Sequence, residues 1–316
     1  MIPRSATLSI CIPAYRRVEY LKRLLDSIAA QSFKDFEVIV TDDSPGTEVH
    51  DLIEHYKDKF TILYFKNAVT LGTPSNWNEA VKHARGEWIK LMHDDDWFSS
   101  TESLRIFADH RNENCKFIFS GYNRVYNKLK PRAEKSVWNS PYNKKIIDEP
   151  AILFADNLIG PPSVTLVHKS AHQEYDERLK WRVDIDLYIR LLKHEKKYAY
   201  IKSSLINIGM SESQVTRSSI NDPGVELPEG WLLIKKYGVQ MLKNVWVYDA
   251  WWRLFRNMNI TTAERLHNYV AESWPKVILR MLNDIGHTPK QLLKWGVTSK
   301  LCMALSYLKN YSTIKK

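Results

Sequence analysis

The sequence predicts an α/β fold, a mostly parallel sheet flanked by helices, with a helical appendage toward the C-terminal end. Over residues 8–92, short apolar runs alternate with stretches of helical periodicity, which is the pattern of parallel βαβ units. The apolar runs are nearly continuous, as in strands that helices cover on both faces. After residue 222 the chain becomes basic and rich in aromatic residues, so a separate helical region is expected there.

The first hundred residues contain the strongest of these patterns. The expected strands and the helices between them lie at 8–15, 18–32, 36–40, 48–60, 61–67, 75–84 and 87–92. The first helix places Leu21, Leu24, Leu25 and Ile28 at helical spacing. Right-handed crossovers bring the carboxyl ends of the strands to one edge, where open α/β sheets bind their ligands.

Beyond residue 98 the pattern is looser. The expected elements are a helix at 99–110, a strand at 116–127, an exposed basic loop at 130–145, a strand within 159–168 and a helix at 183–194. That last helix has Ile185, Tyr188, Ile189 and Leu192 on one face. The polar stretch 211–230 contains Pro and Gly, and we place the main boundary after residue 222.

Composition indicates a folded protein inside the cell. The chain has 316 residues, 44% of them hydrophobic and 26% charged, enough to bury a substantial core. Its three cysteines are widely spaced and odd in number, which fits neither a disulfide framework nor a paired-thiolate zinc site. The N-terminal residues do not resemble a signal peptide, and no run approaches the roughly 18 apolar residues of a membrane span. We expect a cytoplasmic protein.

Positive charge is concentrated in the tail. Residues 225–316 contain 14 Lys and Arg against 6 Asp and Glu, together with six of the eleven tryptophans. Interleaved basic and aromatic residues could bind an anionic membrane surface through 240–316. They could equally form a helical cap whose aromatic side chains are core. Nucleic-acid binding has the least support, because no recognised module accompanies the charge.

The run WIKLMHDDDWF ends an apolar strand in Asp94, Asp95 and Asp96, and a second acidic pair, Asp42 and Asp43, ends another strand. Carboxylates this close repel one another and raise each other's pKa unless a cation lies among them. Helix capping could explain one such Asp, but it does not explain five. Mg²⁺ or Mn²⁺ held by carboxylates commonly binds a substrate phosphate as well. The acids therefore predict a metal ion and a phosphate-bearing substrate.

Two phosphate-binding motifs are missing from the sequence. It has neither the GxxxxGK[ST] loop nor a GxGxxG turn after the first strand, which counts against a P-loop enzyme and a dinucleotide dehydrogenase. Without a glycine-rich cradle, the metal has to balance the charge of a diphosphate. A sugar attached to a nucleoside diphosphate meets this description.

Three segments in order resemble glycosyltransferase family 2, of the kind that builds bacterial surface polysaccharides. They are LSICIPAYRRVEYLKRLLDSIAAQSFKDFEVIVTDDSPG, LGTPSNWNEAVKHARGEWIKLMHDDDW and YDERLKWRVDIDLYIRLL, and the resemblance covers about two thirds of the chain. It implies the GT-A fold of nucleotide-diphospho-sugar transferases. It also implies inversion at the anomeric carbon.

The resemblance further implies roles for particular residues. Asp42 would bind the nucleotide base, Asp94 the ribose, and Asp95 the Mg²⁺ or Mn²⁺ ion. Asp184 would be the general base, with Asp186 as the alternative. The complete set implied to bind the nucleotide sugar is Pro13, Ala14, Tyr15, Arg17, Asp42, Asn78 and Asp94.

Two positions depart from the family pattern. His93 stands where many members have the first Asp of a DxDD motif, and Val183 stands where many have Glu beside the base. We leave His93 out of the metal set, because a lone His is more often packed or solvated. Val183 weakens Asp184 relative to Asp186, but Asp184 aligns with the family's base.

These implications lead to a specific expectation. A catalytic domain at 1–222 would have a nucleotide-binding half (1–100) and an acceptor and base half (101–222), followed by the basic helical region 223–316. The enzyme would transfer one sugar, from a UDP-sugar by preference, to a glycan or lipid-linked acceptor at the inner face of the cytoplasmic membrane. A nucleotidyltransferase that makes nucleotide sugars and an inactive glycan-binding or scaffolding protein are the alternatives.

Overall fold

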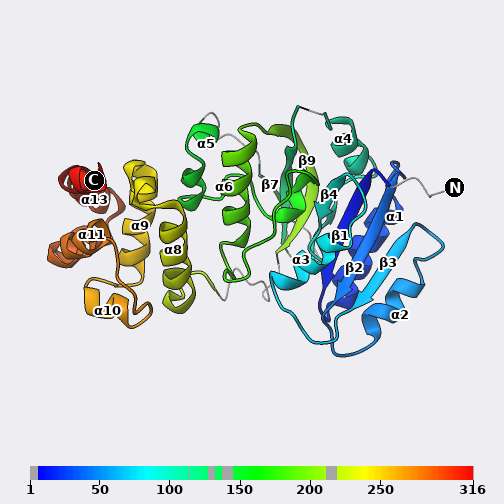
Figure 1. Ribbon diagram of the computed structural model, residues 1–316, viewed down its shortest axis with the longest axis horizontal. Helices are drawn as coiled ribbons and strands as arrows, with labels where there is room; N and C mark the ends of the chain where they lie inside the picture. The colour runs from blue at the N-terminus through cyan, green and yellow to red at the C-terminus, as the bar shows by residue number, and fades with distance from the viewer. Residues whose placement is uncertain (1–5, 113, 127–131, 137–144, 211–218, 316) are drawn as a thin grey trace. The chain divides into compact units, whose positions relative to one another are not determined.

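The computed structural model describes residues 6–112, 114–126, 132–136, 145–210 and 219–315, and Figure 1 labels most of its helices and strands. The chain divides into two compact units. Unit 1 comprises Met1–Asn143, Leu158–Glu177 and Arg190–Glu212, and unit 2 comprises Lys144–Asn157, Arg178–Ile189 and Ser213–Lys316. The expected boundary after residue 222 remains a prediction.

In its described residues, unit 1 contains a mixed sheet of nine strands. Their order is β3-β2-β1-β4-β8-β6-β9-β5, and β7 pairs with β6 outside this path. The strands are β1 Leu8–Ala14, β2 Phe36–Asp42, β3 Ile62–Lys66, β4 Trp88–Leu91, β5 Trp97–Phe98, β6 Phe117–Tyr126, β7 Arg132–Ser136, β8 Thr165–His168 and β9 Ala199–Met210.

Helices flank this sheet. α3 packs against β1 and β2, α1 against β5, and α4 against β9. Leu21, Leu24, Leu25 and Ile28 of α1 are all buried, as the sequence pattern predicts. The helices are α1 Val18–Ala29, α2 Glu48–Glu54, α3 Ser75–Lys82, α4 Ser103–Asp109 and the 3₁₀ turn η2 Pro162–Val164, and α6 Val183–Glu195 runs through both units.

The four N-terminal strands are parallel, and their register determines where the acids lie. Ala14 of β1 pairs with Asp42 of β2, which pairs in turn with Lys66 of β3. On the other side of β1, Cys11 pairs with Leu91, the last residue of β4. The carboxyl ends of β1, β2 and β4 therefore lie at one edge of the sheet. This confirms the α/β fold class, to which β5–β9 add antiparallel pairs.

Two details differ from the sequence-based expectation. The loop expected at 130–145 is wrong for Arg132–Ser136, which form β7 and pair antiparallel with β6. The strand satisfies backbone groups that a loop would leave to solvent. Residues 130, 131 and 137–144 lie outside the described part of the chain. β5 and β9 are not among the expected elements, although β9 pairs with both β6 and β5.

Unit 2 is helical in its described residues. α9, α11 and α13 pack on one another, and α8 contacts η3. The elements outside α6 are α5 Lys145–Asp148, η1 Pro150–Phe154, α8 Pro223–Tyr237, η3 Val239–Lys243, α9 Val245–Asn257, α10 Ala263–His267, α11 Lys276–His287, α12 Lys290–Lys294 and α13 Gly296–Lys315.

Aromatic side chains form the core of unit 2. Trp251 is fully buried, and its ring lies 5.1 Å from that of Phe154, 5.4 Å from Phe255 and 6.0 Å from Trp274. A Cβ atom on Gly230 would come within 2.8 Å of the Trp251 ring, so α8 can approach it only with glycine there. In α9, packing in the core of unit 2 therefore explains why the tail has buried aromatic residues. No helix in the described ranges is both long and apolar enough to cross a membrane.

Candidate functional site

The acidic turn, Asp94–Asp96, begins three residues after the end of β4 at Leu91 and is buried. Three contacts from distant segments hold it: Ser163 Oγ accepts from the His93 N–H (3.0 Å), the Arg23 guanidinium donates to the Asp95 carbonyl (2.7 Å), and the Gly209 N–H donates to Asp96 Oδ1 (3.2 Å). A Cβ on Gly209 would lie only 2.4 Å from the Asp95 carbonyl oxygen. The close approach of β9 therefore requires glycine at this position.

Arg17, just after β1, provides the main positive charge among these acids. Its Nη1 donates to Asp95 Oδ2 at 3.0 Å and its Nε to Asp94 Oδ2 at 3.3 Å, while Nη2 pairs with the other Asp94 oxygen. The guanidinium thus binds two carboxylates at once. Because its side chain is about one-third exposed (33%), Arg17 borders solvent while the acids do not.

The buried environment of the acidic turn disfavours the charged form of its carboxyl groups. Burial raises the pKa of Asp94 to about 7, against the opposing effect of the Arg17 guanidinium. Burial, with the nearby Asp95 carboxylate, also raises the pKa of Asp96 well above its usual value. Burial lowers the pKa of His93 to about 4, so this imidazole is neutral near pH 7. For Asp94 and Asp96, burial therefore disfavours the charged form more than the nearby cations favour it.

The donor set fits a divalent cation. One ligand atom each from His93, Asp95 and Asp96 can be chosen so that all lie within 4.8 Å of one another. Among the described residues, His93 Nε2 and Asp96 Oδ2 are buried without a hydrogen-bond partner. Two carboxylates and a neutral imidazole are ordinary ligands for such ions. The sequence-based set contained Asp95 alone; the signal for the other two is that all belong to one tight turn.

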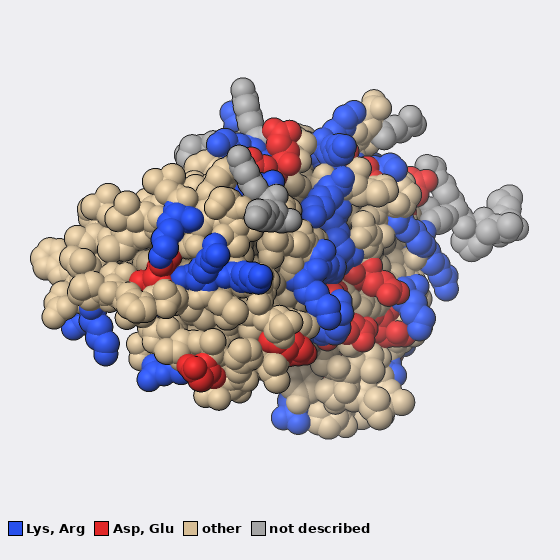
Figure 2. All heavy atoms as spheres, turned by 60° about the vertical axis from the view of Figure 1, so that its left-hand side comes forward, with Lys and Arg blue, Asp and Glu red and all other residues tan. Residues whose placement is uncertain are grey.

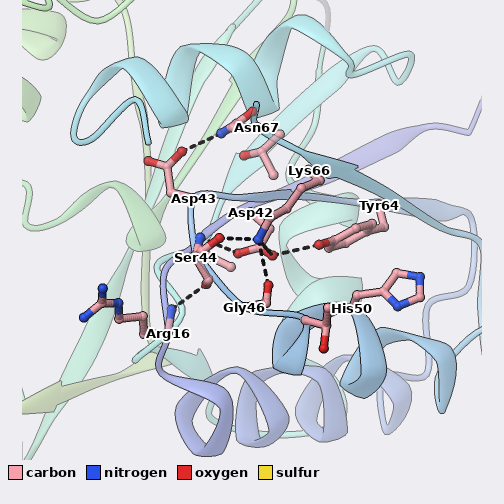
Figure 3. Close-up of polar contacts among 12 residues, drawn as sticks. Arg16, Asp42, Asp43, Ser44, Gly46, His50, Tyr64, Lys66 and Asn67 are labelled. Atoms are coloured by element: carbon pink, nitrogen blue, oxygen red, sulfur yellow. Dashed lines mark hydrogen bonds and ion pairs between the residues drawn. The ribbon is translucent and has the colours of Figure 1, made fainter. Parts of the chain in front are cut away.

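The second acidic pair has a different environment, drawn in Figure 3. Asp42 is fully buried and accepts three hydrogen bonds: from the Ser44 N–H (2.8 Å), the Tyr64 hydroxyl (2.7 Å) and the Lys66 ammonium (2.9 Å). Burial alone would raise the pKa of Asp42, but these donors outweigh it and lower the pKa. The contact of Asp42 with the nucleotide base remains a prediction. Its carboxylate is already held in place by hydrogen bonds within the fold.

Asp43 is held as firmly. Its oxygens accept from the Asn67 side chain (2.6 Å) and from the backbone N–H groups of Leu71 (3.1 Å) and Gly72 (2.8 Å). Asn67 also donates to Asn76, and Asn76 donates to the Thr41 carbonyl at the end of β2. This network orders the loop 67–72 beside the strand ends.

The turn after β1 connects the two acidic groups. The Arg16 N–H donates to Ser44 Oγ at 2.7 Å beside Asp42, while the next residue, Arg17, binds the acidic turn. Tyr15 is 44% exposed, and its ring lies 4.9 Å from the Arg16 guanidinium carbon. Pro13 is half-buried and Ala14 buried. Of Pro13, Ala14 and Tyr15, the exposed side chain is that of Tyr15, at the edge where β1 and β2 end.

Asn78 of α3 has structural partners. Its amide nitrogen donates to the Tyr175 carbonyl (3.0 Å) and to Glu177 (3.1 Å), and its oxygen accepts from the Tyr175 N–H (2.8 Å). These bonds attach segment 175–177 to α3. The predicted role of Asn78 in donor binding remains a prediction.

Asp184 lies in unit 2, in the first turn of α6. Asn157 donates to its Oδ2 at 2.6 Å, and the Ile185 N–H donates to Oδ1 at 2.8 Å. Burial raises the pKa of Asp184 to about 6, although these hydrogen bonds and the Arg182 charge oppose the rise. A carboxylate with a pKa in this range is suited to accept a proton near neutral pH.

A buried set of charges orders the segment before Asp184. Glu229 of α8 accepts from the backbone N–H groups of Lys180 (2.6 Å), Trp181 (2.8 Å) and Arg182 (2.7 Å). The Arg182 guanidinium in turn pairs with Glu226 at 2.7 Å. Sequence reasoning did not identify these two glutamates, because nothing local relates them to residues almost fifty positions away.

Asp186, the alternative base, is locked in place. It is fully buried, pairs with the Lys236 ammonium at 2.7 Å, and accepts from the Tyr237 hydroxyl at 2.5 Å. Both partners lie at the end of α8. The arrangement is that of a structural acid that attaches α6 to α8.

The chain is similar to known glycosyltransferases. The model of the family Glycosyl transferase family 2 matches residues 9–175, just over half of the chain. An uncharacterized glycosyltransferase of Rickettsia typhi is 27% identical over 229 residues, 69% of this chain and 68% of the relative. The putative colanic acid biosynthesis glycosyl transferase WcaA of Escherichia coli K12 is 23% identical over 67% of this chain and 76% of its own.

A shorter match is to the GalNAc(5)-diNAcBac-PP-undecaprenol beta-1,3-glucosyltransferase of Campylobacter jejuni, 32% identical over 35% of this chain and 37% of the relative. Among solved structures, S. aureus TarS 1–349 in complex with UDP-GlcNAc has a TM-score of 0.59 at 16% identity and covers 97% of this chain and 91% of TarS 1–349. The mannosyltransferase PcManGT of Pyrobaculum calidifontis, in complex with GDP-Man and Mn²⁺, has a TM-score of 0.59 at 11% identity and covers 97% and 88%.

Proposed function

This chain belongs to glycosyltransferase family 2 and has the GT-A fold, and from that membership we propose that it is a metal-dependent, inverting transferase of single sugars. Its donor is a nucleoside diphosphate sugar, with UDP-sugars favoured. Its acceptor is a hydroxyl of a lipid-linked glycan in the assembly of a bacterial surface polysaccharide or glycoprotein glycan. The names of WcaA and of the undecaprenol-linked Campylobacter enzyme support this acceptor class.

The edge where β1, β2 and β4 end is the proposed donor site. Tyr15 offers an exposed ring face for the base, and the network of Asp42 and Asp43 keeps the strand ends rigid around it. Asp94 is the proposed ribose contact. Arg17 can donate to the diphosphate, because its guanidinium already lies at the acids that the diphosphate would approach with its metal.

Asp95 is the proposed metal ligand, with His93 and Asp96 as the nearest additional donors. A bound Mg²⁺ or Mn²⁺ ion would supply positive charge to the departing nucleoside diphosphate. The chain's own contribution is to exclude water from the acidic turn and to hold its shape through Arg23, Ser163 and Gly209. The solved PcManGT complex with GDP-Man and Mn²⁺ supports this proposal.

Asp184 is the proposed general base. An acceptor hydroxyl gives its proton to the carboxylate as the oxygen bonds to the anomeric carbon, and the bond from that carbon to the diphosphate oxygen breaks. One displacement of this kind inverts the carbon. Positioned acid–base groups typically contribute about 10²- to 10⁴-fold to a rate. The contrast with Asp186, which is locked by Lys236 and Tyr237, supports Asp184 as the base.

The observation that carries this proposal is the burial of three neighbouring carboxyl groups at the acidic turn, where the surroundings disfavour the charged form of Asp94 and Asp96. The Arg17 guanidinium pairs with two of the three buried carboxylates, Asp94 and Asp95, and one buried Asp96 oxygen has no hydrogen-bond partner among the described residues. A fold that needed these acids only for stability would pair them, as it pairs Asp42. The unmet requirement is for a cation that arrives with the substrate.

The proposal is tested by incubating the full chain with a panel of UDP-, GDP- and dTDP-sugars, with Mn²⁺ or with EDTA, and measuring release of nucleoside diphosphate. We expect slow release from one donor, dependent on the metal and lost in Asp95→Ala. Asp58→Asn, at an exposed acid, should behave as wild type.

Each contrary outcome identifies a rival. Pyrophosphate made from a sugar phosphate and a nucleoside triphosphate would indicate a nucleotidyltransferase. Glycan binding without any turnover would indicate an inactive scaffold. Unchanged metal-dependent donor affinity in Asp95→Ala would remove the metal role of this residue.

A further inference from the structure

Helix α13 exposes aliphatic side chains to solvent, where a surface helix usually has polar ones. Four aliphatic side chains form an outward stripe: Val297 is 77% exposed, Leu301 61%, Leu305 68% and Leu308 70%. Their spacing of four, four and three residues places them on one face over roughly 16 Å of helix. We call this set the leucine stripe. Soluble proteins rarely expose a large contiguous apolar patch, and a patch of this kind commonly marks an interaction site.

The opposite face of α13 carries buried polar groups as well as Met303 and Ile314, and it is docked on the rest of unit 2. Ser299 accepts from the Trp252 indole (3.2 Å), Ser306 shares a hydrogen bond with the Tyr248 hydroxyl (2.8 Å), and Asn310 donates to Asp284 (2.9 Å). All of these groups except Asp284 are buried. Hydrogen bonds therefore attach α13 to α9 and α11, and the leucine stripe is not required for that attachment.

The charges around the stripe are of one sign. From Lys290 to Lys316 the sequence has six lysines and no Asp or Glu. Lys309 pairs with Asp284 at 2.6 Å, whereas in the described part of the chain no ion pair involves the exposed Lys290, Lys294 or Lys300. Figure 2 turns the left-hand side of Figure 1, where α13 lies, toward the viewer; most of that surface is uncharged, with basic and a few acidic side chains among it.

An exposed tryptophan completes the surface. Trp295 joins α12 to α13 and is 74% exposed, and Leu292 of α12 is 40% exposed. Tryptophan is enriched at the boundary between lipid headgroups and acyl chains, since its ring is apolar and its N–H is polar. Aliphatic residues on one face, flanked by lysines and one tryptophan, are the composition of helices that lie in that boundary.

We propose that α12 and α13 are a membrane-docking surface, which seats the leucine stripe and Trp295 in the headgroup region of an anionic bilayer. Anionic lipids would neutralise Lys290, Lys294 and Lys300. A second copy of the chain fits less well, because a symmetric contact through this face would bring lysines together with no acid on α12 or α13 to pair them. The proposal extends the lipid-linked acceptor of the proposed function, and its test needs no turnover.

The test is co-sedimentation of the full chain with vesicles, one set of mixed phosphatidylglycerol and phosphatidylcholine and one of phosphatidylcholine alone. We expect binding to the anionic vesicles that weakens as salt rises, and little binding to the neutral ones. Leu301→Gln/Leu305→Gln should lower the binding constant about tenfold or more. Lys294→Gln/Lys300→Gln should lower it less and flatten its dependence on salt.

The matched control is Val69→Gln/Ile220→Gln, which changes two exposed aliphatic residues outside α12 and α13 and should bind as wild type. Because Leu301 and Leu305 are 61% and 68% exposed, the melting temperature of the leucine variant should stay within about 1 °C of wild type. Donor turnover in solution should also be unchanged.

Three results would overturn the proposal. The first is unchanged binding of the leucine variant to anionic vesicles, and the second is equal binding of the wild type to both kinds of vesicle. The third is a wild-type dimer in sedimentation velocity that the leucine variant dissociates, with no binding to vesicles. Vesicle binding without any release of nucleoside diphosphate would refute the proposed function and leave this proposal standing.

Discussion

The ends of β2 and β4 have similar acidic sequences, but the hydrogen-bond donors around the two groups of acids differ. After β2, the Asp42 and Asp43 oxygens receive donors from Ser44, Tyr64, Lys66, Asn67, Leu71 and Gly72, and the pKa of Asp42 falls. After β4, Asp94 and Asp95 share Arg17, Asp96 accepts from the Gly209 N–H, and burial raises the pKa of both Asp94 and Asp96.

We interpret this difference as separating acids that stabilise the fold from acids that, in the proposed function, bind a cation. A carboxylate surrounded by donors stabilises the fold, whereas one left short of positive charge is stabilised when a cation arrives. The same contrast occurs in α6. Asp186 is locked by Lys236 and Tyr237, while Asp184 keeps a raised pKa with the Asn157 amide as its side-chain donor.

The largest expected effect tests that second pair. Asp184→Asn should lower the rate of sugar transfer about 10²- to 10⁴-fold, because the amide cannot accept the acceptor's proton. Donor affinity, measured by calorimetry, should stay within about twofold of wild type. The comparison variant is Asp186→Asn, which should mainly lower the melting temperature. A folded, active Asp184→Asn beside a folded, inactive Asp186→Asn would reverse the two roles.

The pH dependence of wild-type kcat/KM should be the next largest effect. The pKa of Asp184 is raised to about 6, so the carboxylate is the major form above this pH and is protonated below it. Transfer should therefore fall about tenfold for each pH unit below 6. The control is the melting temperature over the same range, which should change much less. A flat profile between pH 5 and 7 would contradict Asp184 as the base.

A third prediction concerns the stability that Asp42 contributes. Asp42→Asn should cost about 1–3 kcal/mol, because the Lys66 ammonium loses its charged partner in a buried network. Solvent at the part-exposed Lys66 limits the loss. Calorimetry should show that the melting temperature of unit 1 falls by about 2–4 °C for each kcal/mol of lost stability. Asp58→Asn is the surface control.

The sign of the accompanying pH effect follows from the lowered pKa of Asp42. Its stabilising contribution is complete above the unfolded-state pKa of about 4. The contribution disappears as pH falls through the lower folded-state value. The stability difference between wild type and Asp42→Asn should therefore shrink below about pH 4. A difference that grew there would mean that Asp42 is not the lowered acid.

The smallest expected effect concerns Arg17. Arg17→Gln removes the cation that now holds Asp94 and Asp95, so Mn²⁺ should bind the donor-free protein about three- to tenfold more tightly. Free Mn²⁺ can be followed by electron paramagnetic resonance, a readout that does not need turnover. The control is Arg105→Gln, at an exposed arginine outside the site. Weaker Mn²⁺ binding in Arg17→Gln would show that Arg17 organises the acids instead of competing for them.

Local patterns were sufficient to predict the framework. The four parallel strands, the buried face of α1 and the shared edge of β1, β2 and β4 all follow from periodicities of two and 3.6 residues and from the handedness of crossovers. The family resemblance of the three segments was likewise readable without coordinates. The strand β7 was missed, because it is an edge strand of mixed composition whose pairing with β6 leaves no local signature.

Partners distant in sequence could not be predicted in this way. Nothing near Asp42 indicates that Lys66 will reach it, or that Glu229 will cap the turn before Asp184. Charge composition alone could not tell the buried aromatic residues of α9 from the exposed stripe of α13. The chain order of apolar and acidic residues therefore defined the sheet edge and the acids that end there. Which of those acids are neutralised, and which helix face meets solvent, depends on packing between segments that only the folded chain brings together.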